Sequence, residues 1–391
     1  MDIKKRTEEI FDELVAIRRD LHMNPELSGK EIRTSARICE YLEGWGIEYK
    51  SGVAETGVAA IIRGKKAGRT VASRADIDAL PIAEKRDSEY RSRNAGVMHA
   101  CGHDVHTTVQ LGVAKLIKEL EGELAGNVKL FFQPAEEDIG GAERMVAEGC
   151  MSEPEVDNVI GLHVMPYLDA GNIELRYGKL NASSGEFYIN IKGKSGHGAY
   201  PDTTVDAIVI AGSVITSLQS MVSRNVSPLE SVVLSIGKIN GGVKNNIIAD
   251  TVTMSGTLRT LDEAARNRAK AAIRRLAEGT AAAYGGEAEV WFEDGYKALI
   301  NDNEIVDVIK ETAERILGAE NIRYKEFPSL GAEDFSYFLD KAKGAFYHLG
   351  CGNSSKGITA GLHNEYFDVD EECIKTGVYM QVESILALLG R

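Results

Sequence analysis

The chain has 391 residues, more than one ordinary hydrophobic core accommodates, so two domains are expected. Its 45 basic and 59 acidic residues give a formal net charge of −14 at pH 7, which argues against a nucleic-acid-binding protein. No apolar run of membrane-spanning length and no segment of the secretory type is evident, so we expect a cytoplasmic protein without a membrane partner. Five scattered cysteines without zinc-ribbon spacing argue against a disulfide framework.

The first part of the chain alternates helices with short apolar strands. Apolar residues at helical spacing predict a helix at 6–21, ended by Pro25, and a second helix that continues to about residue 46. In chain order there follow strands at 57–62 and 70–73, a helix at 105–124, a strand at 128–132, a helix at 140–149 and a strand at 159–164. This alternation predicts an α/β sheet with parallel pairs, in which functional sites gather at the carboxyl ends of the strands.

A different pattern begins after residue 182. Strict alternation at 186–192 predicts a half-buried strand, and it is followed by a helix at 204–222, strands at 231–239 and 251–259, a helix at 261–283 and a strand at 288–292. This order is typical of a ferredoxin-like α+β domain. The first pattern then returns, with a helix at 304–317, a strand at 345–349 and a terminal helix at 370–389. We therefore expect residues 183–294 to be inserted into a domain formed by 1–182 and 295–391.

The densest group of candidate metal ligands lies at 98–108, where three histidines and a cysteine occur in eleven residues. Cys101 and His103 are separated by Gly102, whose conformational freedom allows both side chains to face one centre. Thiolate and imidazole are ligands that zinc and similar ions accept. The same pattern also fits a buried thiol beside a surface histidine, so this motif alone does not distinguish the two.

Three consecutive acids, Glu136, Glu137 and Asp138, follow the predicted strand 128–132 and precede a helix. One interpretation is a solvated charge run at a helix N-terminus, where acidic residues are favourable. The other is a metal centre, at which one carboxylate ligates an ion while its neighbour accepts a proton from the attacking water.

Two isolated histidines complete the set of candidates. His163 lies inside an apolar strand, where a histidine is usually a hydrogen-bonded core residue, and His363 lies in a loop before the last helix. Imidazoles and carboxylates from scattered strand ends are what a dinuclear hydrolytic centre requires, with two ions roughly 3.5–4 Å apart.

These motifs, in this order, resemble the di-metal amidohydrolases related to aminoacylase and carboxypeptidase G, in the branch that contains hippurate hydrolases and auxin-conjugate (IAA-amino acid) hydrolases. The resemblance runs almost end to end. The matching motifs are Arg19-x-Leu21-His22-x-x-Pro25-Glu26-Leu27, Arg74-Ala75-Asp76-Ile77-Asp78-Ala79-Leu80-Pro81, His99-Ala100-Cys101-Gly102-His103-Asp104-x-His106, Gln133-Pro134-Ala135-Glu136-Glu137, Gly161-Leu162-His163, Gly196-His197, Gly331-Ala332-Glu333-Asp334-Phe335 and Gly361-Leu362-His363.

The resemblance implies a mixed-sheet, phosphorylase/hydrolase-like catalytic domain that binds two divalent ions, which would be zinc, manganese, cobalt or nickel. The implied ligands are Cys101, His103, Glu137, His163 and His363, with Cys101 bridging. Glu136 would be the general base that activates water and then protonates the leaving amine. Asp78 would orient a ligand imidazole, while Asp76 is expected to be structural. His99 and His106 are expected to support the site without ligating directly.

The inserted domain would act as a lid and as the surface of a homodimer. The resemblance implies that His197 reaches the neighbouring subunit's site and stabilises the oxyanion of the tetrahedral intermediate. Asn246 and Arg259 are candidates for binding substrate oxygens, and a planar guanidinium suits a carboxylate. A turn-forming asparagine and a surface arginine are the alternative interpretations of these two residues.

The expected activity is metal-dependent hydrolysis of the amide bond of an N-acyl-amino acid, which releases a carboxylate and a free amino acid. A dipeptidase or carboxypeptidase on the same scaffold is the alternative. A metal-storing protein without catalysis is a third hypothesis, which the presence of Glu136 disfavours. The acyl group and the amino acid side chain leave no motif in the sequence.

Overall fold

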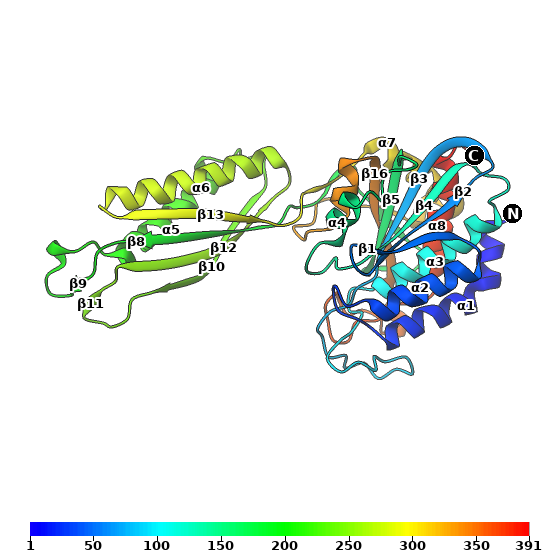
Figure 1. Ribbon diagram of the computed structural model, residues 1–391, viewed down its shortest axis with the longest axis horizontal. Helices are drawn as coiled ribbons and strands as arrows, with labels where there is room; N and C mark the ends of the chain where they lie inside the picture. The colour runs from blue at the N-terminus through cyan, green and yellow to red at the C-terminus, as the bar shows by residue number, and fades with distance from the viewer. Residues whose placement is uncertain (391) are drawn as a thin grey trace. The chain divides into compact units, whose positions relative to one another are not determined.

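The computed structural model describes residues 1–390, which form two compact units, each with its own hydrophobic core. Unit 1 contains Met1–Leu180, Ile300–Phe327 and the chain from Asp334 onward. Unit 2 contains Asn181–Leu299 together with the short segment Pro328–Glu333. Figure 1 shows both units.

Unit 1 is built on an eight-stranded mixed sheet with the strand order β1-β2-β4-β3-β5-β16-β6-β15 (Figure 1). Its strands are β1 (Glu48–Val53), β2 (Gly57–Arg63), β3 (Lys66–Asp76), β4 (Ala125–Gln133), β5 (Asn158–Asp169), β6 (Ile173–Leu175), β15 (Ile322–Tyr324) and β16 (Lys343–Gly352). The four central strands, from β4 to β16, pair in parallel. The predicted α/β architecture with a mixed sheet is confirmed.

Six helices pack around this sheet. They are α1 (Ile3–Met23), α2 (Ile32–Gly44), α3 (His103–Glu119), α4 (Gly141–Ala147), α7 (Asn303–Ile316) and α8 (Cys373–Leu388). In α1 the buried positions Ile10, Leu14, Ile17 and Leu21 repeat at helical spacing, and Asp2 caps its first turn by accepting from the Lys5 amide. Helices α3 and α8 are buried on nearly all sides, so they form the centre of the unit 1 core.

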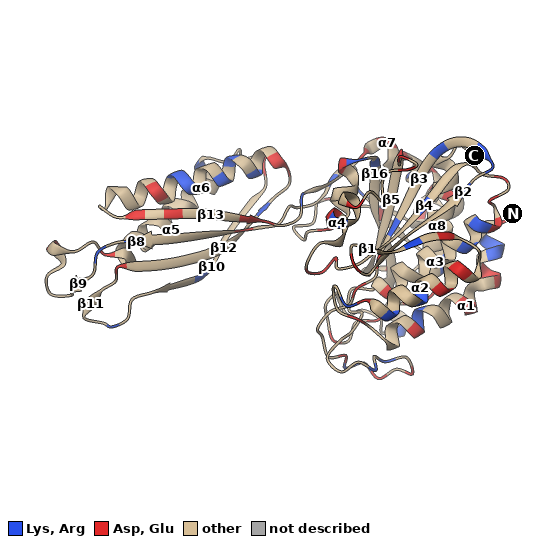
Figure 2. Cartoon of the chain, in the orientation of Figure 1, with Lys and Arg blue, Asp and Glu red and all other residues tan. Residues whose placement is uncertain are grey.

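Unit 2 has the chain order strand, helix, two strands, helix, strand. These elements are β8 (Gly185–Lys192), α5 (Ala207–Arg224), β10 (Val232–Gly241), β12 (Thr251–Thr260), α6 (Glu263–Ala283) and β13 (Glu287–Asp294). The strands form an antiparallel sheet in the order β10-β12-β8-β13, which is the ferredoxin-like arrangement. The exposed charged residues of α6 are visible in Figure 2.

Several short elements complete the chain. The strands β9 (Gly196–His197) and β11 (Ile247–Ile248) pair with each other, as do β7 (Gly178–Asn181) and β14 (Leu299–Asn301). Single turns of 3-10 helix lie at Pro201–Thr203, Ala319–Asn321 and Ser354–Lys356, and a longer one at Asp334–Asp340.

Helix α5 differs from the expectation that no apolar run reaches membrane-spanning length. Among residues 1–390 it is the one helix that is long and apolar enough to cross a membrane, judged by length and composition alone. Its buried residues Ala207, Ile210, Ala211, Val214, Leu218 and Met221 belong to the core of unit 2.

Candidate metal centre

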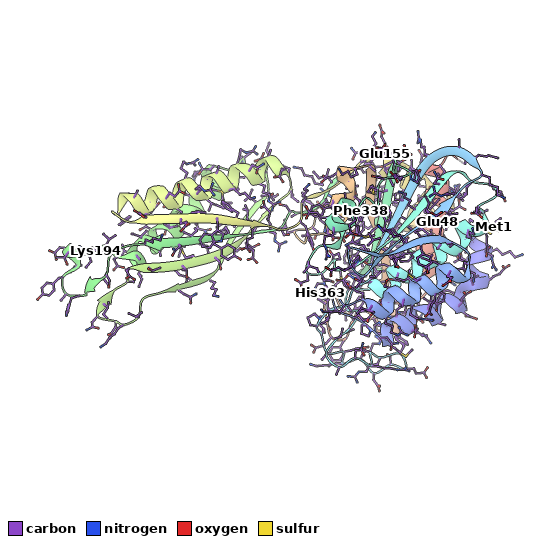
Figure 3. The ribbon with its side chains drawn as sticks, in the orientation of Figure 1. Met1, Glu48, Glu155, Lys194, Phe338 and His363 are labelled. Atoms are coloured by element: carbon purple, nitrogen blue, oxygen red, sulfur yellow. The ribbon has the colours of Figure 1, made fainter. Side chains whose placement is uncertain are left out.

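The candidate ligands of unit 1 come from the central parallel strands and from the loops near their carboxyl ends. In the register of β3 and β4, Asp76 lies opposite Gln133, so the two segments that follow these strands leave the sheet side by side. His103 is the first residue of α3, Cys101 lies two residues before it, and His163 lies within β5. His363, labelled in Figure 3, lies in the loop between β16 and α8.

The five predicted ligands meet around one thiol. The Cys101 Sγ atom lies 3.3 Å from His163 Nε2 and 3.3 Å from His363 Nε2. Glu137 Oε1 lies 3.3 Å from His363 Nε2 and 3.8 Å from His103 Nε2. Cys101 therefore belongs to two groups of three candidate ligand atoms, one with His103 and His163 and one with Glu137 and His363. Its bridging of two ions stays a prediction.

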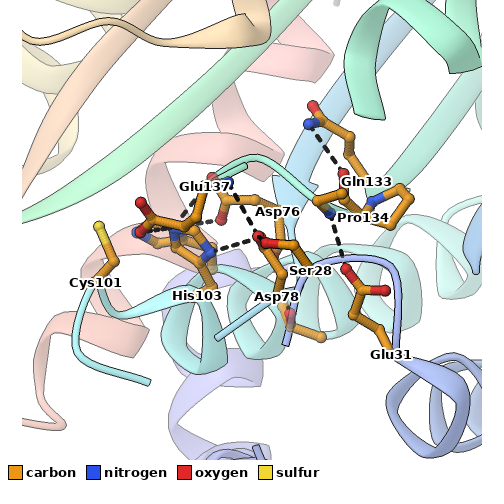
Figure 4. Close-up of polar contacts among 12 residues, drawn as sticks. Ser28, Glu31, Asp76, Asp78, Cys101, His103, Gln133, Pro134 and Glu137 are labelled. Carbon is orange, nitrogen blue, oxygen red and sulfur yellow. Dashed lines mark hydrogen bonds and ion pairs between the residues drawn. The ribbon is translucent and has the colours of Figure 1, made fainter. Parts of the chain in front are cut away.

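One buried ring nitrogen of this cluster, His103 Nε2, lacks a hydrogen-bond partner. It faces Glu137 Oε1 at 3.8 Å (Figure 4). An unsatisfied polar atom in a protein interior is costly, so the folded chain alone leaves this nitrogen short of a partner. A cation would satisfy it, and a donor set of one thiolate, imidazoles and a carboxylate suits zinc or another borderline divalent ion. The residues therefore fit the dinuclear centre that the sequence predicts.

The electrostatics of the cluster favour positive charge. Burial lowers the pKa of His103, but the carboxylates of Asp76 and Asp78 outweigh it and raise that pKa to about 10. Burial raises the pKa of the Cys101 thiol well above its usual range, and the neighbouring carboxylates of Glu137 and Glu136 raise it further. A thiolate at this position therefore requires a cation beside it.

Hydrogen bonds from Nδ1 orient the imidazoles of His103 and His163. His103 Nδ1 donates to Asp78 Oδ1 at 3.1 Å, which leaves Nε2 facing the cluster. His163 Nδ1 donates to the carbonyl oxygen of Val164 at 2.7 Å, which likewise leaves Nε2 towards Cys101. Asp78 thus stands where the resemblance places an orienting acid, and such hydrogen bonds set the tautomer of a ligand histidine.

Asp76 and His106 hold each other. Asp76 accepts from Arg74 at 2.7 Å and from His106 Nδ1 at 2.6 Å. The other ring nitrogen of His106 accepts from the Val164 amide at 2.9 Å, so both nitrogens of this histidine are occupied. Both residues lie close to His103. The atoms of all three residues also form a candidate ligand group, so the supporting roles of Asp76 and His106 stay predictions.

His99 is fully buried, and neither of its ring nitrogens has a hydrogen-bond partner. Burial lowers its pKa to about 4, so this imidazole is neutral near pH 7. It belongs to none of the metal-ligand groups found among residues 1–390.

Glu136 lies in a tightly held loop between β4 and α4. It is 8 % exposed, and its carboxylate belongs to one group with the ligand atoms of His103 and Glu137. A Cβ atom on Gly141 would lie 1.8 Å from the Pro134 carbonyl oxygen, so the loop closes against glycine. Asp334, from the late motif at 331–335, accepts from Gln133 Nε2 and the Ala142 amide, which ties both ends of the loop together.

The three predicted residues of the inserted domain, His197, Asn246 and Arg259, lie in unit 2. His197 is exposed on β9, shortly after Lys194, which is labelled in Figure 3, and its Nδ1 accepts from the Ala199 amide at 3.1 Å. Since Nδ1 is an acceptor, Nε2 carries the proton and is free to donate. Asn246 lies beside it, because its carbonyl accepts from the Gly198 amide at 2.9 Å. Arg259 lies apart from this pair, on β12 opposite Val233.

A mixed α/β sheet with thiol, imidazole and carboxylate ligands at its strand ends, and a further carboxylate beside them, defines a metal-dependent hydrolase. The chain belongs to peptidase family M20/M25/M40, whose family model matches residues 72–387. The predicted resemblance is thereby confirmed, and the chain is a metal-dependent amidohydrolase or peptidase of that family.

Three similar proteins cover nearly the whole chain. The N-acetyl-L-cysteine deacetylase of Bacillus subtilis is 40% identical over 377 residues, which are 96% of this chain and 88% of that protein. Thermostable carboxypeptidase 2 of Saccharolobus solfataricus is 41% identical over 379 residues, 96% of this chain and 95% of that protein. The crystal structure of a dinuclear metal binding peptidase of the M20 family from Bacillus subtilis matches with a TM-score of 0.87 and 34% identity, and it covers 98% of this chain and 99% of that one.

Proposed function

We propose that this protein hydrolyses the amide bond of N-acyl-amino acids, such as N-acetyl or N-benzoyl derivatives, to a carboxylate and a free amino acid. The observation that carries the proposal is the buried Glu136 carboxylate beside the thiol, imidazole and carboxylate cluster. Relatives named as deacetylases, amidohydrolases and IAA-amino acid hydrolases support the substrate class.

In this mechanism Cys101, His103, Glu137, His163 and His363 would hold two divalent ions. When bound, the ions would polarise the acyl carbonyl and lower the pKa of the attacking water. Glu136 accepts the proton of that water and returns it to the leaving nitrogen, so one carboxylate serves as base and then as acid. Asp78 keeps His103 in the required tautomer throughout.

Unit 2 supplies the remaining groups of the proposal. His197 donates from Nε2 to the oxyanion. Asn246 and Arg259 bind substrate oxygens at separate places, and the planar guanidinium of Arg259 suits a carboxylate. We further propose a homodimer formed through unit 2, in which His197 of the partner subunit serves the centre. Ile208 and Val209, in the first turn of α5, are 52% and 51% exposed, so two large apolar side chains of unit 2 face outward there.

The test of catalysis is Glu136→Gln. The amide keeps the shape of the side chain but cannot accept the proton, so we expect both metals to remain and turnover to fall by about a thousandfold or more. Elemental analysis measures the metals, and hydrolysis of N-acetyl and N-benzoyl amino acids measures turnover. Substantial residual hydrolysis would remove Glu136 from its role.

A dipeptidase or carboxypeptidase activity is the second candidate, because carboxypeptidases are among the relatives. Chelated enzyme reconstituted separately with zinc, manganese, cobalt or nickel would be assayed on blocked amino acids beside unblocked dipeptides. We expect the higher kcat/KM on the blocked substrates. A preference for unblocked dipeptides with every metal would favour the alternative.

A further inference from the structure

The segment at 26–31, between α1 and α2, packs against the residues that follow β3. The Glu26 carbonyl accepts from the Ala79 amide at 2.8 Å, and Leu27 forms a bridge with Ala79. Ser28 Oγ donates to Asp78 Oδ2 at 2.7 Å. This segment, which carries the end of the first matching motif, thus supports the acid that orients His103 (Figure 4).

Glu31 reaches from the end of this segment to the loop that carries Glu136. Its Oε1 atom accepts from the Ala135 amide at 2.9 Å and from the Gly29 amide at 3.0 Å. Its Oε2 atom accepts from the Thr56 hydroxyl at 2.6 Å. The residue is 0% exposed, and these contacts join three segments that are distant in sequence.

Ala135 is the residue that requires this support. Its φ angle is 55°, in the left-handed region that residues with a Cβ atom seldom adopt. On the other side of Glu136, the Glu137 amide donates to Asp78 Oδ2 at 3.0 Å. The two amides that flank Glu136 are therefore each bound by a buried carboxylate from a different part of the chain.

We propose that Glu31 is a positioning residue for the hydrolysis, because it binds the Ala135 amide, holds that residue in its left-handed conformation and so directs the Glu136 carboxylate. The inference rests on the proposed function of Glu136. Ser28 acts in parallel through Asp78, so the segment at 26–31 secures both sides of the base.

The first comparison is Glu31→Gln against Glu31→Ala. The glutamine oxygen accepts from the Ala135 and Gly29 amides as the carboxylate does, and its NH2 group donates to the Thr56 hydroxyl, so only the Thr56 hydrogen bond is reversed and the charge is removed. We expect Glu31→Gln to keep kcat within about twofold, and Glu31→Ala to lower kcat by about tenfold or more while KM changes little. An alanine variant with unchanged kcat would overturn the proposal.

The second comparison places the same substitution in an Ala135→Gly background. Glycine adopts positive φ without the steric penalty of a Cβ atom, so the loop depends less on Glu31 there. The factor by which Glu31→Ala lowers kcat should then be smaller than in the wild-type background. An equal loss in both backgrounds would show that Glu31 does not act through the conformation of Ala135.

A control and an independent readout separate positioning from general destabilisation. Ile38→Ala opens the core under α2 without touching the loop, and it should lower the melting temperature while leaving kcat of the folded enzyme unchanged. Hydrogen exchange of the Ala135 amide, resolved with overlapping peptides, should accelerate in Glu31→Ala and not in Glu31→Gln. Unchanged exchange in Glu31→Ala would overturn the proposal. If wild-type enzyme hydrolyses no acyl substrate, the proposed function fails, while the exchange comparison still decides the role of Glu31.

Discussion

At the scale of single residues, the thiol of Cys101 combines two features that conflict in the chain alone. It lies 3.3 Å from two imidazoles, and burial among carboxylates holds its pKa well above the usual range. A neutral thiol is a poor ligand, whereas a thiolate bound to a cation is a good one. Metal content and the protonation of this residue should therefore change together.

This coupling predicts that Cys101→Ala lowers the metal content per chain. The measurement is elemental analysis after dialysis, with Cys39→Ala as the control, because Cys39 is a half-buried free thiol of α2 outside the cluster. Metal content equal to that of wild type in Cys101→Ala would show that the thiol is only packed.

Glu174 makes the stability of the protein fall at acidic pH. Burial raises the pKa of Glu174, but hydrogen bonds from His348 and Tyr167 outweigh it and lower that pKa from 4.5 to about 2. The folded state thus binds this proton less tightly than the unfolded state, so the stabilisation is present above about pH 4.5 and is lost as the pH falls towards 2. In Glu174→Gln the free energy of unfolding, measured by urea titration, should change less between these values than in wild type. Identical slopes would contradict this assignment.

At the scale of elements, helix caps account for where several helices begin. Asp262 precedes α6, and its side chain accepts from the Ala265 amide at 2.7 Å. Asp262→Ala should lower the stability of unit 2 by about 1 kcal/mol. Urea unfolding followed by far-UV circular dichroism measures the change, and Glu263→Ala, an exposed residue of the first turn, is the control. Equal effects of the two substitutions would remove the cap as the cause.

The long helices and central strands could be predicted from the sequence because their apolar residues recur with a clear period. Strand β1 was not predicted, because its Glu48, Tyr49 and Lys50 lie at the exposed edge of the sheet and carry no alternation. The three-residue strands β6 and β15 are too short to show a period. Such strands are defined by their neighbours in space rather than by their own residues.

The site shows the same division. Residues with chemically distinctive side chains, such as Cys101 and Glu136, could be proposed from motifs and from the family resemblance. Glu31 could not be proposed in this way. Its buried carboxylate accepts a hydrogen bond from a backbone amide 104 positions away, and no motif or spacing in the sequence marks such a contact. The sequence also does not show that both ring nitrogens of His106 have hydrogen-bond partners, because one partner, the Val164 amide, is brought near only by the fold.

At the scale of the whole molecule, the proposed homodimer predicts a change in both mass and activity. Replacing Ile208 and Val209 together by aspartate would put two charges in place of the exposed apolar side chains in the first turn of α5, which should dissociate the dimer. Analytical ultracentrifugation measures the mass, and elemental analysis should find the metals retained. Turnover should fall, because His197 of the partner subunit would be lost. A fully active monomer would contradict the proposed role of His197.

The order of the strands in the large sheet also determines when the protein can fold during synthesis. Strand β16 lies inside the sheet, between β5 and β6, yet it and α8 come from the last part of the chain. Unit 2, in contrast, lies almost wholly within the continuous stretch Asn181–Leu299. Because domains fold as units while the ribosome extends the chain, unit 2 should be native on a nascent chain whose first 180 residues still await their central strand. Arrested chains should accordingly acquire protease resistance in the middle of the sequence before they acquire it at the N-terminus.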